Sequence, residues 1–307
     1  WHLEKTKSFM QTKKGIPDFN SSEPDFLIGA MNRHKGWAVI VCLIGGGQEI
    51  NDGEGGMEEW LRALKDHYPE WRVWTSYQLD SKYYLPTFDL NHLKGRLIKI
   101  EHLHLGVSIR SFRSEKVSKA ITSLLEDEKE EALKSFREIS DFYPIKITRS
   151  IEKAKEWLRA KARGSERFGI LVSSGAKRLK PLGLFAGIVS EKGTPNWFLN
   201  NHEDIRSSFA LEDPATEFQV QGLELDWAGI VWDGDLIKTK NNWLYKSFVG
   251  CRWTNINKSI DQKYKLNSYR VLLTRARQGM VIVIPKGDEK DPTRQRKIYD
   301  PTWNYLR

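Results

Sequence analysis

Two short segments of the sequence are apolar almost throughout, residues 37–44 (WAVIVCLI) and 168–173 (FGILVS). A strand with one face in water alternates apolar and polar residues, so continuous apolar runs indicate strands that are buried on both faces. Such strands are typical of parallel sheets that carry helices on either side. These two segments therefore predict an α/β protein.

Helical and strand patterns alternate along the rest of the chain. They cover residues 57–68, 71–78, 97–109, 115–139, 143–148, 151–163, 228–232 and 280–284. Repeated alternation predicts parallel sheets in which ligands lie at the carboxyl ends of the strands. Because the turn-rich residues 86–95 separate two such series, we expect one domain over residues 1–90 and a second over residues 91–307, with a short basic tail at residues 286–297.

The composition is that of a soluble globular chain, with 39% hydrophobic and 29% charged residues over 307 positions. No apolar run approaches the roughly 18–20 residues of a membrane-spanning helix, so no membrane partner is expected. Cys42 and Cys251 lie far apart without other ligand-type residues at suitable spacing, which argues against disulfides and a metal site. A cytoplasmic setting fits best, and the net charge of +9 favours polyanionic partners.

A glycine-rich segment, residues 45–56 (GGGQEINDGEGG), follows the first apolar run. A phosphate-binding loop requires G-x-x-x-x-G-K-[ST], since the lysine neutralises phosphate and the hydroxyl holds magnesium, and this ending is missing. The predicted strand instead delivers Gln48, whose amide could contact a terminal phosphate or a water. From the glycines alone, a flexible connecting loop is the better interpretation.

Arg110 and Arg113 lie at a predicted strand-to-helix junction in residues 108–121 (SIRSFRSEKVSKAI). Guanidinium groups at this position could bind phosphate in a bidentate manner, with the help of a helix N-terminus capped by Ser114. Surface arginines paired with acids such as Glu115 are the alternative.

Two later segments place polar residues beside apolar strands. In residues 215–235 a polar strand leads to Gly222 and then to Glu224, which could accept hydrogen bonds from ribose hydroxyls. In residues 269–285 (YRVLLTRARQGMVIVIP), Arg275 emerges from an apolar helix-like run, as an arginine finger for a γ-phosphate does. A helix C-terminal arginine that interacts with the helix dipole is the alternative for Arg275.

In this order and spacing, the four segments resemble superfamily-one, UvrD-like helicase motors, and in particular bacterial helicases related to the helicase domain of schlafen proteins. IGGGQEIN, which contains Gln48, is similar to the segment that senses the γ-phosphate in these helicases. The FRS of residues 112–114 is similar to the segment that opens their second domain, and this implies that Arg113 binds a nucleotide phosphate. QGLE at residues 221–224 resembles the KGLE segment. LLTRAR resembles the sixth helicase segment, which makes Arg275 the expected finger.

The resemblance also implies contacts for individual residues around QGLE. Gly222 and Glu224 would lie against the nucleotide, and Thr216 would contact nucleic acid. Phe218 stands where UvrD-like proteins carry a nucleic-acid-contacting histidine, and Gln221 replaces their lysine.

The resemblance implies a RecA-like P-loop NTPase fold with helices on both faces of parallel sheets, and an incomplete first RecA-like domain. The chain begins WHLEKTKSF, which is neither an initiator methionine nor a signal peptide, so we expect a fragment that starts just after the Walker B strand. The intact protein would be a nucleic-acid-dependent ATPase using ATP and Mg²⁺, with magnesium ligands mostly upstream. Its expected partner is single-stranded DNA or RNA, and a nuclease could be fused to it or accompany it.

Two other functions fit the same residues. An ATP-gated switch or scaffold would bind nucleotide and nucleic acid without unwinding. A plain nucleic-acid-binding module would use its arginines on backbone phosphates and would be indifferent to ATP.

Overall fold

The computed structural model describes residues 1–43, 55–80, 88–104 and 112–307. The chain divides into two compact units, unit 1 (Trp1–Val107) and unit 2 (Ser108–Arg307). Short 3-10 helices join larger elements in both units, at Tyr77–Asp80, Leu90–Leu93, Glu101–Leu103, Lys177–Leu182, Glu191–Gly193 and Ser208–Ala210.

Unit 1 contains three helices and one pair of strands among its described residues: α1 (Leu3–Lys14), α2 (Glu23–Met31), α3 (Gly56–Asp66), β1 (Val73–Thr75) and β2 (Leu97–Lys99). α3 is the helix predicted from residues 57–68. β1 and β2 pair in parallel with Val73 opposite Leu97, and both residues pack on a core of Leu61, Leu79 and Leu93. Residues 97–99 therefore belong to unit 1. The division into two RecA-like domains at residues 90 and 91 stays a prediction.

The predicted strand at residues 37–44 is wrong for the part that is described. Residues 37–43 have no regular secondary structure, and Trp37, Val41 and Leu43 are each at least 80% exposed. A strand buried on both faces needs a neighbour on each side, and the described strands of unit 1 pair only with each other. Apolar character alone therefore did not produce a strand here.

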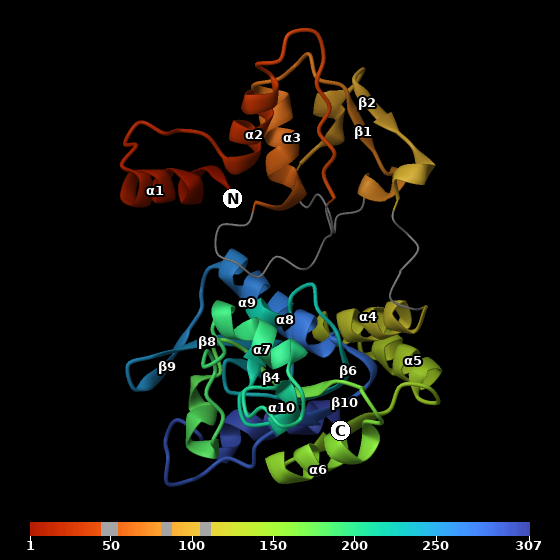
Figure 1. Cartoon of the computed structure of the whole chain (residues 1–307), viewed down its shortest axis with the longest axis vertical. Helices are drawn as coiled ribbons and strands as arrows, with labels where there is room; N and C mark the ends of the chain where they lie inside the picture. Colours follow the sequence, from red (N-terminus) through yellow and green to blue (C-terminus); the bar gives the residue numbers. More distant parts are fainter. Residues whose placement is uncertain (44–54, 81–87, 105–111) are drawn as a thin grey trace. The chain divides into compact units, whose positions relative to one another are not determined.

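Unit 2 is built on a five-stranded parallel sheet in the order β3-β10-β6-β4-β5. Its strands are β3 (Ile145–Thr148), β4 (Phe168–Val172), β5 (Ala215–Thr216), β6 (Leu225–Val231) and β10 (Ala276–Val283). β4 and β6 are buried along their whole length, as continuous apolar runs predict. The helices are α4 (Phe112–Leu125), α5 (Lys129–Ile139), α6 (Ile151–Lys161), α7 (Thr194–Leu199), α8 (Glu217–Val220), α9 (Ser259–Leu273) and α10 (Arg296–Leu306) (Figure 1).

Helix packing confirms the predicted fold class. α6 lies against β6 and β10, and a Cβ atom at Gly229 would come within 3.0 Å of Leu158 on that helix. The small residue therefore lets the helix approach the sheet closely. Unit 2 is an α/β domain with a parallel sheet flanked by helices, consistent with a RecA-like fold.

Three local expectations differ from the structure. The helix expected over residues 115–139 is two helices, because the chain turns at Asp127, whose φ is +65°. The polar strand expected after residue 215 is the two-residue β5 followed by α8. Residues 286–297 are not a free tail, because the helix α10 that follows buries Tyr299 and Thr302.

An antiparallel sheet, which the sequence patterns did not predict, lies between β6 and α9 in the sequence. It consists of β7 (Leu236–Lys238), β8 (Trp243–Val249) and β9 (Arg252–Asn255), in that order. Lys238 is 2% exposed and its Nζ is 3.0 Å from Asp127 Oδ2 at the α4–α5 turn. This ion pair fastens the added sheet to the helices of unit 2.

Within the described ranges, no helix combines the length and the apolar character that crossing a bilayer requires.

Candidate functional site

The predicted site residues Glu224 and Arg275 lie at one edge of the five-stranded sheet. Glu224 directly precedes β6, and Arg275 directly precedes the neighbouring strand β10, with Leu225 N donating to Arg275 O at 3.0 Å. They therefore lie at the amino ends of their strands. The sequence predicted ligands at the carboxyl ends of the strands, but Glu224 and Arg275 lie at the opposite ends, because each directly precedes its strand.

The Arg275 guanidinium joins two of the predicted motifs. Nε donates to Val271 O at 3.0 Å, and Nη1 lies 3.4 Å from both Val220 O and Leu223 O. The residue is only 1% exposed. Arg275 thus holds the turn that contains Gly222, whose φ of +83° requires the left-handed conformation that glycine adopts readily.

A second arginine at the same edge is exposed. Arg277 Nη2 is 2.5 Å from Asp226 Oδ1, and its side chain is 56% exposed. The hydrogen bond with Asp226 raises the pKa of Arg277. Asp226 also accepts from the Arg167 amide at 2.8 Å, so it is fixed in position. The edge therefore presents Arg277 to solvent and encloses Arg275.

Of the predicted nucleic-acid residues, Thr216 ends β5 and Phe218 lies in the helix α8 that follows. Thr216 N donates to Gln219 Oε1 at 2.8 Å in a capping box that starts α8. Thr216 is buried, whereas Phe218 is 47% exposed. Only the phenylalanine offers a surface on which a base could stack.

The remaining predicted residues are only partly placed. Gln48 and Arg110 lie outside the described residues, and the Arg113 side chain is not described. α4 begins at Phe112, so Ser114 lies inside its first turn and is not the residue that precedes the helix. The predicted cap at Ser114 is therefore wrong, although a helix does begin next to Arg113.

The carboxyl edge of the same sheet holds a buried network of polar side chains. Asp235, after β6, is fully buried and accepts from Ser173 Oγ at 2.6 Å, Lys265 Nζ at 2.8 Å and Tyr269 OH at 2.5 Å. Burial lowers the pKa of Lys265, but the neighbouring Asp235 charge outweighs it, so the net shift is upward. Lys265 is therefore charged and compensates Asp235.

Asp233, two residues earlier, has no such cation among the residues that the structure describes. Its carboxylate accepts from Tyr299 OH at 3.0 Å and from the Arg178 amide at 2.8 Å. Burial and the Asp235 charge raise the pKa of Asp233 to about 7. In the described part of the chain, no three His, Cys, Asp or Glu side chains are grouped so that they could hold a metal ion.

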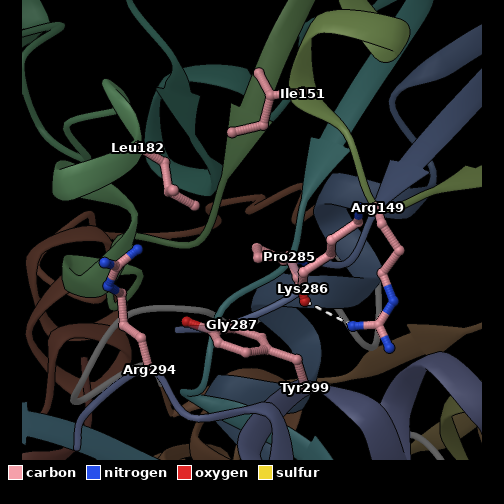
Figure 2. Close-up of a pocket in the computed structure, with 8 residues that line it drawn as sticks. All are labelled: Arg149, Ile151, Leu182, Pro285, Lys286, Gly287, Arg294 and Tyr299. Carbon is pink, nitrogen blue, oxygen red and sulfur yellow. Dashed lines mark hydrogen bonds between the residues drawn. The ribbon is translucent and has the colours of Figure 1, made fainter. Parts of the chain in front are cut away.

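A cavity of about 200 Å³ opens where β3 and β10 end (Figure 2). Its lining consists of Arg149, Ile151, Leu182, Pro285, Lys286, Gly287, Arg294 and Tyr299. Arg149 donates to Pro285 O at 2.7 Å and pairs with Asp300, and Arg294 pairs with Asp291 at 2.9 Å. Because both guanidinium groups are already neutralised, we assign no ligand to this cavity.

Comparison with protein families matches residues 6–286 to the Schlafen group 3 DNA/RNA helicase domain. The chain belongs to the Schlafen group 3 helicase family. No curated protein matches it. The match spans all the residues that the four motifs single out and stops before α10.

In this Schlafen-type domain the structure also brings together residues that the motifs did not include. Asp233 and Asp235 stand within the segment that supplied Glu224, in WDGD. The sequence could have indicated these two acids, because they directly follow the apolar residues 228–232 and polar residues after a parallel strand lie at the carboxyl edge of its sheet. Lys265 gave no such signal, because only the folded chain brings it to Asp235.

Replacing Asp233 by asparagine is expected to stabilise this Schlafen-type domain at pH 8. In the unfolded chain Asp233 loses its proton near pH 4, but in the folded protein it keeps the proton to about pH 7. Between these values the folded state binds more protons, so the free energy of unfolding falls as pH rises. The asparagine side chain has no charge to gain, and urea unfolding should show a stabilisation of about 2 kcal/mol at pH 8 that vanishes near pH 4.

Asp291→Asn serves as the control of opposite sign. Hydrogen bonds from Thr293 and Arg294 hold the pKa of Asp291 below its usual range, so this variant should lose stability at pH 8. Equal stability of wild type and Asp233→Asn at pH 8 would show that Asp233 does not carry the raised pKa.

Proposed function

We propose that this chain is the C-terminal portion of a nucleic-acid-dependent ATPase that moves on or unwinds DNA or RNA. The observation that carries the proposal is the contact of Arg275 with the carbonyls of Val220 and Leu223. It joins the segment similar to KGLE with the segment similar to the sixth helicase motif, at adjacent strands of a RecA-like sheet. Membership of a DNA/RNA helicase family supports the same proposal.

The residues at this edge fit the sugar end of ATP better than its phosphates. Gly222 is exposed in a tight turn and Glu224 is half-buried next to it, so a ribose hydroxyl could reach that carboxylate. Arg275 is enclosed by carbonyl oxygens and offers no donor to solvent. In the proposal Glu224 therefore positions the sugar, and Arg275 fixes the turn and reaches phosphate only if it leaves those carbonyls.

In the proposal Gln48 and Arg113 serve the phosphates of ATP, as their resemblance to helicase segments implies. ATP would supply the phosphoryl group, and Mg²⁺ would neutralise charge on its phosphates. The 307 residues contain no G-x-x-x-x-G-K-[ST] sequence, so the proposal places the phosphate-binding lysine and most magnesium ligands in a segment upstream. The chain alone is then expected to show no measurable turnover, and sustained ATP hydrolysis by these residues would contradict this assignment.

Glu224→Gln in the full protein is expected to reduce kcat/KM for nucleic-acid-stimulated ATP hydrolysis by roughly tenfold to a hundredfold. The loss corresponds to one charge-assisted hydrogen bond to the sugar. Glu203→Gln, an exposed acid in the same unit, is the matched control and should leave kcat/KM unchanged. Equal rates for both variants would remove Glu224 from the nucleotide site.

An ATP-gated switch without unwinding is the second candidate, and the exposed Phe218 favours it. A phenylalanine can stack on a base, but unlike histidine it cannot hydrogen-bond to the strand. Strand displacement by the full protein separates the two, since a switch hydrolyses ATP and leaves a duplex intact.

A further inference from the structure

The antiparallel strands β8 and β9, with the residues that flank them, form a basic arm, defined here as residues 240–258. It contains the bases Lys240, Lys246, Arg252 and Lys258 and no acidic residue. Within the part of the chain that the structure describes, none of these four side chains has an acidic partner. The arm therefore carries uncompensated positive charge.

The arm is anchored on the body of unit 2 by one face. Phe248 and Trp253 pair across the strands with ring centroids 5.1 Å apart, and Trp253 Nε1 donates to Thr293 O at 2.8 Å. The Arg178 guanidinium lies 5.1 Å from the centre of the Phe248 ring. Because alternate residues of a strand point to opposite sides, the Val249–Arg252 pair faces away from this anchor, and both residues are exposed.

The arm adjoins the sheet edge where the proposed nucleic-acid residues lie. Exposed Lys177 begins the 3-10 helix that follows β4 and donates from Nζ to Phe248 O of the arm at 3.3 Å. In the loop between β4 and this helix, Ser174 donates to Glu217, the residue before Phe218, at 2.6 Å. The segment after β4 thus connects Phe218 to the arm, and Figure 1 shows β8 and β9 reaching outward from the sheet.

We propose that the basic arm, together with Lys177, binds the phosphate backbone of a single-stranded nucleic acid that passes Phe218. This inference rests on the proposed function. Exposed cations without acidic partners beside an exposed aromatic ring are the combination with which single-strand binders hold backbone and bases. The arm contacts phosphates without reading sequence, and it extends the strand-binding surface beyond Thr216 and Phe218.

The test compares two charge-matched triple variants of the full protein. The arm variant is Lys240→Ala, Arg252→Ala and Lys258→Ala, at three exposed positions. The control is Lys153→Ala, Arg159→Ala and Lys161→Ala on α6, whose three side chains are likewise exposed and which Figure 1 shows away from the arm. Fluorescence anisotropy of a labelled oligothymidine is recorded against salt concentration without ATP.

The arm variant is expected to bind roughly tenfold more weakly than wild type near physiological salt. Its plot of log affinity against log salt should be shallower by about 2, since three phosphate contacts each contribute about 0.7 for single strands. The α6 control should match wild type. Equal affinity and slope for the arm variant, or an equal loss in the α6 control, would overturn the proposal.

Further measurements separate this inference from its premise. If the triple variant fails to fold, the single variant Arg252→Gln at an exposed position repeats the test, with an expected slope change of about 0.7. If the arm variant hydrolyses ATP and binds nucleic acid as wild type does, the role of the arm is contradicted and the proposed motor function is not. If binding depends on the arm but nucleic acid does not stimulate ATP hydrolysis, the proposed motor function is contradicted and the role of the arm is not. Equally arm-dependent binding to a duplex would overturn the assignment to a single strand.

Discussion

Replacing Arg275 by alanine is expected to lower the free energy of unfolding of unit 2 by about 3 kcal/mol. Arg275 is 1% exposed, and its guanidinium donates to carbonyls at the end of α9 and in the turn before β6. The truncation leaves those oxygens without this donor and opens a cavity, and both effects destabilise. Urea denaturation followed by circular dichroism measures the loss.

Arg277→Ala is the matched control two residues along the chain. Its side chain is 56% exposed, so its pair with Asp226 should contribute no more than about 1 kcal/mol. A comparably small effect of Arg275→Ala would contradict the structural role assigned to Arg275. The comparison also bears on enzymology, because lost ATP hydrolysis in Arg275→Ala identifies a finger only if the variant is still folded under the assay conditions.

Replacing Lys265 by methionine is expected to destabilise unit 2 by about 3–5 kcal/mol at pH 8. The change removes the cation 2.8 Å from Asp235 Oδ2 and leaves a fully buried carboxylate that accepts from the hydroxyls of Ser173 and Tyr269. Removing one partner of a buried ion pair destabilises a protein more than removing both, because the desolvation of the remaining charge is no longer offset. Thermal and urea unfolding of the single variant measure the effect.

The double variant Lys265→Met with Asp235→Asn tests the cause. Removing the carboxylate charge together with the cation should recover a large part of the lost stability. Lys263→Met, at an exposed position of the same helix, should change it by less than about 0.5 kcal/mol. A double variant as unstable as Lys265→Met would show that packing, and not charge, governs this position.

The strands of unit 2 could be predicted from sequence because their partners are present. β4 lies between β5 and β6, and its apolar run becomes fully buried. Residues 37–43 have an equally apolar pattern, but Trp37, Val41 and Leu43 remain exposed, since burial depends on neighbours that a local pattern does not contain. The antiparallel strands β8 and β9 were missed because their exposed and half-buried residues give no continuous apolar signal.

The candidate site was predictable to the extent that it is local in sequence. Gly222 and Glu224 lie in the predicted turn, and Arg275 stands at the predicted helix-to-strand junction. The sequence did not indicate that Arg275 is enclosed, because its acceptors at Val220 and Leu223 are more than fifty residues away. Contacts of this range decide whether an arginine is a ligand-binding group or a structural one.

α8 connects the two edges of the sheet through a single helical turn. Its first residue, Glu217, is held by Ser174 at the carboxyl edge, and its last, Val220, by Arg275 at the amino edge. One turn is too short to bend, so its two ends cannot move independently. Phe218 and the Gly222 turn are therefore linked through α8, and under the proposed function a movement of Arg275 toward a nucleotide would also move the Phe218 ring.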